Sequence, residues 1–191
     1  MMMSRDEALA LLHEYTKTDS LRRHAYAVEA SCRAYARKYG EDEEKWGITG
    51  LLHDFDYEMY PTQAEHTIVG ARILAEKGFP EDVIYAIRAH ADYNNLERNS
   101  LLDKVLYASD ELSGFVMAVA MVRPTKNVAD VEVKSVKKKL KDKAFARGVN
   151  RDDVYRGAEE LGVPLDDHIA FVIEALTAVS DRLGLDGTET A

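Results

Sequence analysis

The spacing of apolar residues along the chain predicts helices almost throughout. Positions three and four residues apart stay apolar in segment after segment, and no segment alternates apolar and polar positions as a half-exposed strand would. The predicted fold class is therefore all-α. We expect nine helices, over about residues 5–17, 19–39, 41–52, 61–77, 80–90, 100–122, 131–144, 150–162 and 165–183.

Residues typical of helix ends separate these segments. Gly40 is expected to end the second helix, and Gly78 stands where a C-terminal cap of the fourth would be. Pro61 and Pro80 are expected to open the fourth and fifth helices, where a missing backbone N–H costs little. The tail after Gly184 is predicted to fray.

The composition changes after Pro124, which suggests a domain boundary. Residues 126–151 contain nine basic and three acidic residues, although the whole chain has a formal net charge of -9. We predict a helical core over residues 1–124 that carries the functional site, and a helical extension over residues 125–191 that packs on the core. A run of basic residues is most often a solvated helix face. Binding of a substrate phosphate is the alternative for this segment.

The overall composition limits the classes of function. With 191 residues, 46% of them hydrophobic, the chain can form a sizeable core. Its negative charge argues against stable nucleic-acid binding. No apolar run reaches the roughly 18 residues that a membrane-spanning helix needs, so we expect no membrane partner. The single cysteine, Cys32, fits a cytoplasmic location, where thiols stay reduced.

Six ionisable residues stand where the helical pattern predicts an inward-facing side chain or the end of an apolar helix. A single buried histidine is usually explained by a bond to a backbone carbonyl, and Asp110 alone could pair with an arginine such as Arg88. Six such groups together would be costly to bury without partners. A divalent cation would neutralise the carboxylates and use the imidazole lone pairs, so the sequence predicts a metal site. The six residues are His24, His53, Asp54, His66, His90 and Asp110.

The order and spacing of these residues resemble the HD superfamily of metal-dependent phosphohydrolases. The run from His53 to His90 is especially similar to the HDIG-type subgroup, in which the His-Asp pair is followed by a histidine with Gly-Ala four and five residues on. His66, Gly70 and Ala71 match that pattern. A Pro-Glu-x-Val-Ile helix ending in a histidine then matches residues 80–90.

The resemblance covers about residues 20–122 and departs from the subgroup at three points. Tyr57 stands where many HDIG proteins carry a lysine. Ala91 stands where a second histidine often follows the first, and the chain has no Gly-Tyr-Pro motif.

The resemblance implies an HD-domain helical bundle, with the C-terminal helices as an addition, and a centre for one or two divalent cations. Mixed nitrogen and oxygen ligands favour Mn, Fe, Co, Ni or Zn over Ca or Mg. The one-metal centre of the family maps onto His24, His53, Asp54 and Asp110. Relatives with two metals add histidines at the positions of His66 and His90, with the aspartate at the position of Asp54 bridging the ions.

The implied activity is hydrolysis of a phosphate ester by a metal-activated water, as a phosphatase or phosphodiesterase. The expected partner is a small phosphorylated molecule, with a nucleotide favoured, and a homodimer is compatible with the sequence. The candidate catalytic residues are Asp54, Asp56 and Glu58. Asp56 and Glu58 could orient the water or carry protons, or they could be solvated loop carboxylates. Arg123 is the candidate phosphate ligand.

Two alternative functions fit the same fold. A signalling or scaffold module could keep the HD-type helices without chemistry, although such modules typically lose metal ligands and this chain has a full set. A two-iron oxygenase of the HD type would use the same ligands for oxidative chemistry.

Overall fold

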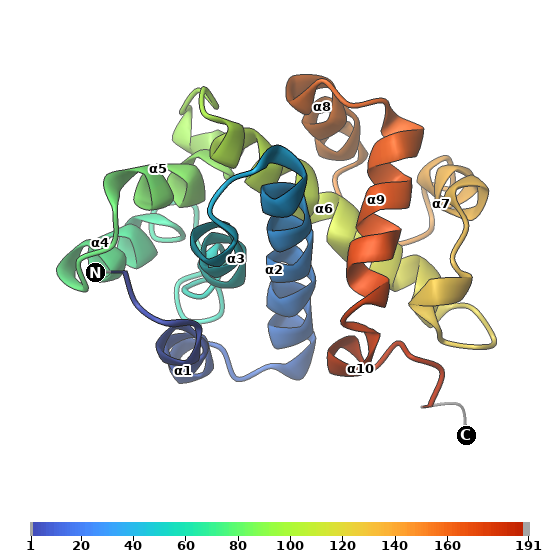
Figure 1. Ribbon diagram of the computed structural model, residues 1–191, viewed down its shortest axis with the longest axis horizontal. Helices are drawn as coiled ribbons and strands as arrows, with labels where there is room; N and C mark the ends of the chain where they lie inside the picture. Colours follow the sequence, from blue (N-terminus) through green and yellow to red (C-terminus); the bar gives the residue numbers. More distant parts are fainter. Residues whose placement is uncertain (1, 189–191) are drawn as a thin grey trace. The chain divides into compact units, whose positions relative to one another are not determined.

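The structure, a computed structural model, describes residues 2–188. Within these residues the chain forms ten α-helices and two short 3-10 helices (Figure 1). Their only extended pairing is an isolated bridge between Asn127 and Asp186. The predicted all-α class is confirmed. None of the described helices combines the length and the apolar character needed to cross a membrane.

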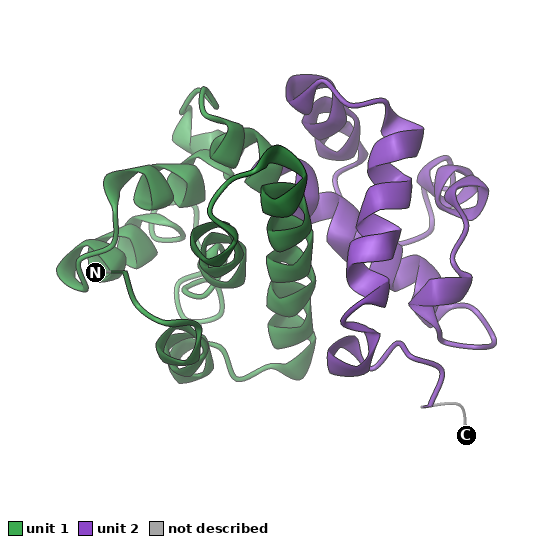
Figure 2. Cartoon of the chain, in the orientation of Figure 1, with its two compact units in different colours: residues 1–106 green, residues 107–191 purple. Residues whose placement is uncertain are grey.

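The chain divides into two compact units, residues 1–106 and residues 107–191 (Figure 2). The division falls inside α6 (Leu101–Met121), so both units share one helix. The predicted boundary, between residues 1–124 and residues 125–191, lies just after the end of that helix. The predicted core with its functional site and the predicted extension packed on it stay predictions.

In unit 1 the helix α3 lies at the centre. Its neighbours are α2, with which it packs most extensively, α1 and α5. All of its residues from Trp46 to Leu52 are buried. Gly50 permits the close approach of α2, because a Cβ atom there would lie 2.8 Å from the carbonyl oxygen of Val28. The helices of this unit are α1 (Arg5–Tyr15), α2 (Asp19–Tyr39), α3 (Glu43–Leu52), α4 (Ile68–Glu76), α5 (Glu81–Ala89) and the 3-10 helix η1 (Asp92–Asn94).

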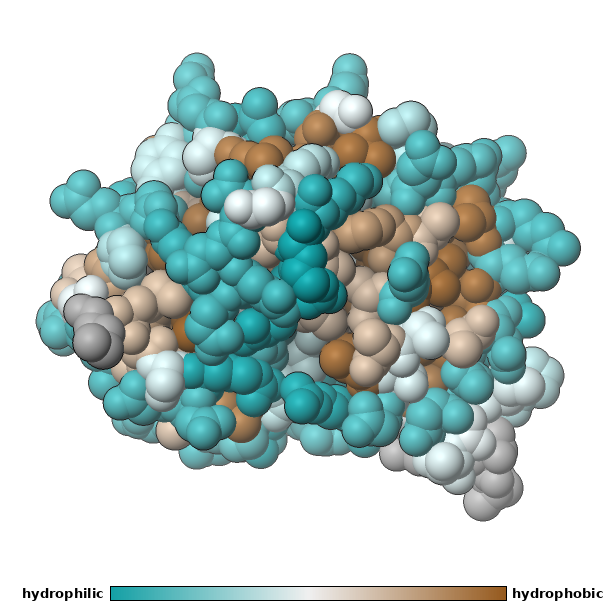
Figure 3. Space-filling model, viewed as in Figure 1, coloured by the Kyte–Doolittle hydropathy of each residue, from teal (hydrophilic) through white to brown (hydrophobic). Residues whose placement is uncertain are grey.

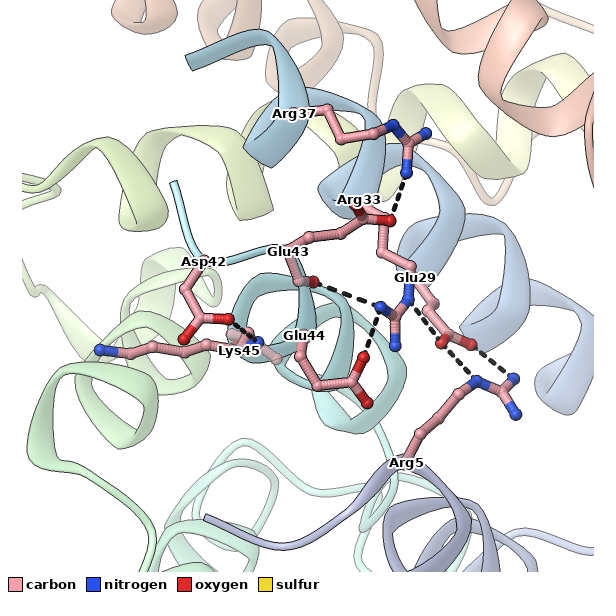
Figure 4. Close-up of polar contacts among 9 residues, drawn as sticks. Arg5, Glu29, Arg33, Arg37, Asp42, Glu43, Glu44 and Lys45 are labelled. Atoms are coloured by element: carbon pink, nitrogen blue, oxygen red, sulfur yellow. Dashed lines mark hydrogen bonds and ion pairs between the residues drawn. The ribbon is translucent and has the colours of Figure 1, made fainter. Parts of the chain in front are cut away.

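A network of ion pairs joins α1, α2 and the start of α3. Glu29 is buried and accepts hydrogen bonds from Arg5 and Arg33, and Arg33 also reaches Glu44 (Figure 4). On the face drawn in Figure 3, hydrophilic residues cover the region of α2 and α3. The polar side of these helices is therefore tied together by paired charges.

The predicted ends of the second and fourth helices are confirmed. Gly40 follows α2 with a φ of 71°, and Gly78 follows α4 with a φ of 79°. Both angles lie in the left-handed region that glycine adopts without strain. Pro80 takes the N-terminal cap position of α5, one residue before the helix begins.

The prediction that Pro61 opens the fourth helix was wrong. Residues 61–67 form turns, and α4 begins only at Ile68. Thr67 has a φ of 65°, which is outside the right-handed helical region and interrupts the helix. The amide of Asn94 donates a hydrogen bond of 2.7 Å to the Thr67 hydroxyl. As a result His66 lies in a turn before the helix and not on a helix face.

Unit 2 contains the rest of α6 and five further helical segments, with α9 in contact with the other four. Gly157 permits a close approach of α8 to α6, since a Cβ atom there would lie 2.7 Å from the Cα atom of Ala108. The segments are η2 (Val128–Asp130), α7 (Val133–Leu140), α8 (Arg151–Leu161), α9 (Leu165–Thr177) and α10 (Ser180–Leu183).

Three predictions for this unit need correction. The basic helix α7 covers only part of the predicted residues 131–144. The single last helix is two helices, because Val179 leaves helical geometry at a φ of -125°. The tail does not fray immediately after Gly184: Leu185 is buried, and its carbonyl accepts a 2.8 Å hydrogen bond from the amide of Val128. Residues 189–191 of the predicted tail lie outside the described residues.

Candidate metal centre

The C-terminal end of α3 carries the first two candidate ligands. His53 is the cap residue of the helix and is fully buried. Asp54 follows it, with 27% of its side chain exposed. Because α3 is buried from Trp46 to Leu52, it places this pair inside unit 1, at a point where one carboxylate is still partly exposed. The predicted position of the pair at a helix end is confirmed.

Three histidines from separate segments face the Asp54 carboxylate. Its Oδ1 atom lies 3.0 Å from His66 Nε2 and 3.1 Å from His90 Nε2. Its Oδ2 atom lies 3.4 Å from His53 Nε2. His66 comes from the turn before α4, and His90 is the cap residue at the end of α5. The potential ligand atoms of Asp54, His66 and His90 all lie within 4.8 Å of one another.

The far ring nitrogen of each of these histidines is held by an acceptor. His53 Nδ1 donates to the carbonyl of Gly50 at 2.8 Å, and His90 Nδ1 donates to the carbonyl of Ile87 at 2.5 Å. His66 Nδ1 donates to the Asp56 carboxylate at 2.9 Å. A carbonyl or ionised carboxylate only accepts, so each Nδ1 carries the proton. In the neutral rings the Nε2 lone pairs therefore point at Asp54.

Lone pairs that face a carboxylate oxygen need a cation between them. Protons on all three rings would bury several charges together, which is costly. A divalent metal ion satisfies the nitrogen and oxygen donors at once, and backing of the far ring nitrogen is the usual arrangement behind a metal-bound histidine. The donor set present at Asp54 fits a divalent transition metal ion.

His24 belongs to the same group of side chains. It lies on α2 and is half-buried, with its ring centroid 5.2 Å from that of His53. One ligand atom from each of His24, His53 and Asp54 lies within 4.8 Å of the others. Unit 1 thus brings five of the six predicted ligands together around Asp54.

Asp110, the sixth predicted ligand, is half-buried on α6, in the part of that helix that belongs to unit 2. Arg123, the predicted phosphate ligand, is half-buried just after α6 and also belongs to unit 2. Their roles stay predictions.

Asp56 and Glu58, the other predicted catalytic residues, are both engaged in hydrogen bonds. Asp56 is 1% exposed, and its two oxygens accept from His66 Nδ1 and from the backbone N–H of Gly70. Glu58 accepts from the Thr18 hydroxyl at 2.6 Å and from the backbone N–H of Lys17 at 2.5 Å. Asp56 therefore lies behind the ring of His66, and Glu58 lies beside the start of α2.

The contacts at the centre shift two pKa values strongly. Burial by itself raises the pKa of Asp54, but His53, His66 and His90 hold that pKa well below its usual value. Burial by itself lowers the pKa of His66, but its bonds to Asp54 and Asp56 raise that pKa to about 9. Both directions show that this position favours an anionic carboxylate beside a positive charge.

Two tyrosines flank His66 and were not predicted as part of the site. The ring of Tyr57 lies 5.2 Å from that of His66, and the ring of Tyr93 lies 6.4 Å from it. Tyr57 is 42% exposed. Burial and the nearby carboxylates of Asp54 and Asp56 raise the pKa of Tyr93 to about 12. Tyr93 follows His90 closely, which is the only sequence signal that could have identified it.

The histidines outside the group have other partners. His13 Nε2 lies 2.7 Å from the Tyr26 hydroxyl, and His168 Nε2 donates to the carbonyl of Ala108 at 2.8 Å. These two histidines therefore make contacts outside the group around Asp54.

Fold and site define a helical domain with a cluster of histidines and an aspartate that could hold a metal ion. Residues 21–114 match the family model of the HD domain. This segment is similar to HD domains, and the match supports the predicted HD superfamily. The finer assignment to the HDIG-type subgroup stays a prediction.

Several similar curated proteins are named ribonuclease Y. The chain is 32% identical over 92 residues to ribonuclease Y of Oleidesulfovibrio alaskensis, and this aligned segment covers 48% of this chain and 17% of that protein. It is 28% identical over 133 residues to ribonuclease Y of Desulfotalea psychrophila, and this aligned segment covers 68% of this chain and 25% of that protein. The chain thus spans a quarter or less of the length of these relatives. No solved structure matched significantly.

Proposed function

We propose that this protein is a metal-dependent phosphohydrolase that cleaves a phosphoester of a small molecule, with a nucleotide as the expected substrate. The observation that carries the proposal is the common orientation of His53, His66 and His90. Each has its Nδ1 proton bound by an acceptor and its Nε2 atom within 3.4 Å of the Asp54 carboxylate. The HD domain match supports the same class of activity.

The ligands of one ion would be His24, His53 and Asp54, with Asp110 as the predicted fourth. A second ion would take Asp54, His66 and His90. When bound, a divalent ion supplies a Lewis acid for a phosphoryl oxygen and lowers the pKa of a water molecule.

The chain's own residues hold and shape the site. The carbonyls of Gly50 and Ile87 orient two of the imidazoles, and Asp56 orients the third. Leu52 and Phe55, which flank His53 and Asp54 in sequence, are 0% and 1% exposed, so this part of the chain is buried in apolar surroundings. Asp54 stays anionic and partly exposed, which leaves one side of the centre open to a substrate.

Two features bear on the choice of substrate. The net charge of -9 favours a small phosphorylated molecule over a long nucleic acid. The name of the ribonuclease Y relatives says that they act on RNA, which makes an RNA phosphodiester the alternative. Both substrates contain a nucleotide phosphoester. The expected ring contacts of a nucleotide are Tyr57 and Tyr93, because aromatic side chains stack on bases.

Elemental analysis of the purified protein, followed by assays with that metal, tests the proposal. The panel would contain nucleoside monophosphates, small phosphodiesters and a short RNA. We expect bound transition metal and hydrolysis of a small nucleotide. His53→Ala and Asp54→Ala should lose both metal and activity, while His13→Ala should keep both because His13 lies outside the group.

Other outcomes point to the alternatives. Metal-free protein without hydrolytic activity indicates a scaffold module. Bound iron with oxygen consumption and no hydrolysis indicates an oxygenase. Full metal content in both His53→Ala and Asp54→Ala contradicts the assignment of the site.

A further inference from the structure

Two hydrogen-bond donors contact the Asp56 side chain, one at each carboxylate oxygen, and they constrain these oxygens differently. Its Oδ2 atom accepts the backbone N–H of Gly70 at 2.8 Å, and its Oδ1 atom faces His66 Nδ1 at 2.9 Å. Gly70 lies in the first turn of α4, where a backbone N–H has no partner within its own helix. The cap residue of that helix, Thr67, makes no side-chain cap bond. Asp56 therefore caps α4 and holds the His66 ring at the same time.

These two bonds decide which nitrogen of His66 is available to a metal. A neutral imidazole carries one proton, and the carboxylate of Asp56 draws that proton to Nδ1. The Nε2 lone pair then faces Asp54 Oδ1 at 3.0 Å. We propose that Asp56 is a positioning residue that selects the metal-binding tautomer of His66, so that the second ion depends on Asp56 while the first does not. This inference rests on the proposed function, since it concerns the second ion of the same centre.

An asparagine at position 56 separates the two roles of the side chain, which are to cap α4 and to orient the ring of His66. The amide has one acceptor oxygen, and the backbone N–H of Gly70 can only donate. The oxygen must therefore face Gly70, and the NH₂ group must face His66 Nδ1. His66 Nδ1 then has to accept, which moves its proton to Nε2 and blocks that atom as a ligand. The helix cap survives in Asp56→Asn, but the metal-binding tautomer does not.

His53 gives the internal comparison. Its Nδ1 proton is held by the carbonyl of Gly50 and not by a side chain. A substitution at position 56 leaves that bond in place. The ion held by His24, His53 and Asp54 should therefore bind Asp56→Asn as it binds the wild-type protein.

Calorimetric titration of the metal-free protein with Zn²⁺ and with Mn²⁺ provides the test. We expect two ions in the wild-type protein. In Asp56→Asn one ion should keep its affinity and the other should weaken by about 10-fold to 100-fold, the usual effect of removing the residue behind a metal-bound histidine. Asp103→Asn is the matched control, because Asp103 is also buried and caps the start of α6 through the backbone N–H groups of Asn99 and Ser100.

Nitrogen NMR of the histidine rings in the zinc-loaded protein gives a readout that a merely structural role would not move. The wild-type protein should show the His66 proton on Nδ1, and Asp56→Asn should show it on Nε2. The wild-type spectrum tests the inference even when the variant does not fold, since a proton on Nε2 of His66 in the loaded wild-type protein overturns it.

The outcomes separate this inference from the proposed function. Two ions of unchanged affinity in Asp56→Asn overturn the role of Asp56 and leave the hydrolase proposal standing. A single ion in the wild-type protein also overturns the inference, but it agrees with a one-metal hydrolase. A wild-type protein that binds no ion overturns both.

Discussion

Glu29 is the buried centre of the ion network of unit 1, and its replacement by glutamine measures what that network contributes to stability. Its carboxylate accepts from Arg5 Nε at 2.7 Å, from Arg5 Nη2 at 2.9 Å and from Arg33 Nε at 3.0 Å (Figure 4). Only 5% of the Glu29 side chain is exposed. The hydrogen bond with Glu29 raises the pKa of Arg5.

The size of the effect follows from what the arginines lose. Glutamine has nearly the same shape, but it is neutral and turns one acceptor into a donor that faces a guanidinium. Removing one partner of a fully buried ion pair costs about 3–5 kcal/mol. The side chains of Arg5 and Arg33 are 26% and 17% exposed, so they keep some hydration. We therefore expect Glu29→Gln to lower the free energy of unfolding by about 2–3 kcal/mol.

Urea denaturation followed by far-ultraviolet circular dichroism measures this change. The midpoint should fall while the dependence of the unfolding free energy on urea stays the same. Glu14→Gln is the control, because Glu14 is an exposed carboxylate on α1. A loss in Glu29→Gln of less than about 0.5 kcal/mol, the range of ordinary surface substitutions, would refute the reasoning.

Three further predictions concern the glycines, the metal and pH. Gly70→Ala places a Cβ atom 2.7 Å from Asp56 Oδ2, so it should weaken one bound ion by about 10-fold in a metal titration. Gly157→Ala places a Cβ atom 2.7 Å from the Cα atom of Ala108, so it should lower the free energy of unfolding by about 1–3 kcal/mol with unchanged metal content. Equal metal affinity in Gly70→Ala and Gly157→Ala would contradict the prediction that only Gly70→Ala disturbs metal binding. A chelator should lower the midpoint of thermal unfolding, because the inward-facing histidines lose their partner, and equal midpoints would count against a bound metal. Glu58 accepts hydrogen bonds at the start of α2, and these lower its pKa from the ordinary value of 4.5, so its contribution to folding stability is present above pH 4.5 and disappears as pH falls through the lowered value. Plots of the unfolding free energy against pH for Glu58→Gln and the wild-type protein should therefore converge in acid. Parallel plots would contradict this prediction.

The sequence alone was sufficient for the features that depend on neighbouring residues. Helical periodicity identified the all-α class, and Gly40 identified the end of α2. The apolar run that ends in His53 and Asp54 identified a helix end that carries two polar side chains. These features could be predicted because helix periodicity and caps arise from contacts within a few residues.

The errors arose where a distant contact decided the local conformation. Nothing near Pro61 in sequence indicates that Thr67 interrupts the helix, since its hydroxyl is bonded to Asn94 in another segment. The hydrogen-bond partners of Asp56 and Glu58 could not be predicted for the same reason, and their predicted chemical roles stay predictions. Glu58 bonds to residues of the α1–α2 connection, and Asp56 bonds to Gly70 across a turn.

The kinds of side chain that face inward were set by the sequence, because their spacing follows the helical repeat. Which nitrogen of each histidine faces Asp54 was decided only by the tertiary structure. That choice depends on the acceptor behind each ring, a carbonyl for His53 and His90 and a carboxylate for His66. An imidazole has two equivalent candidates for its proton until the packed chain places an acceptor beside one of them.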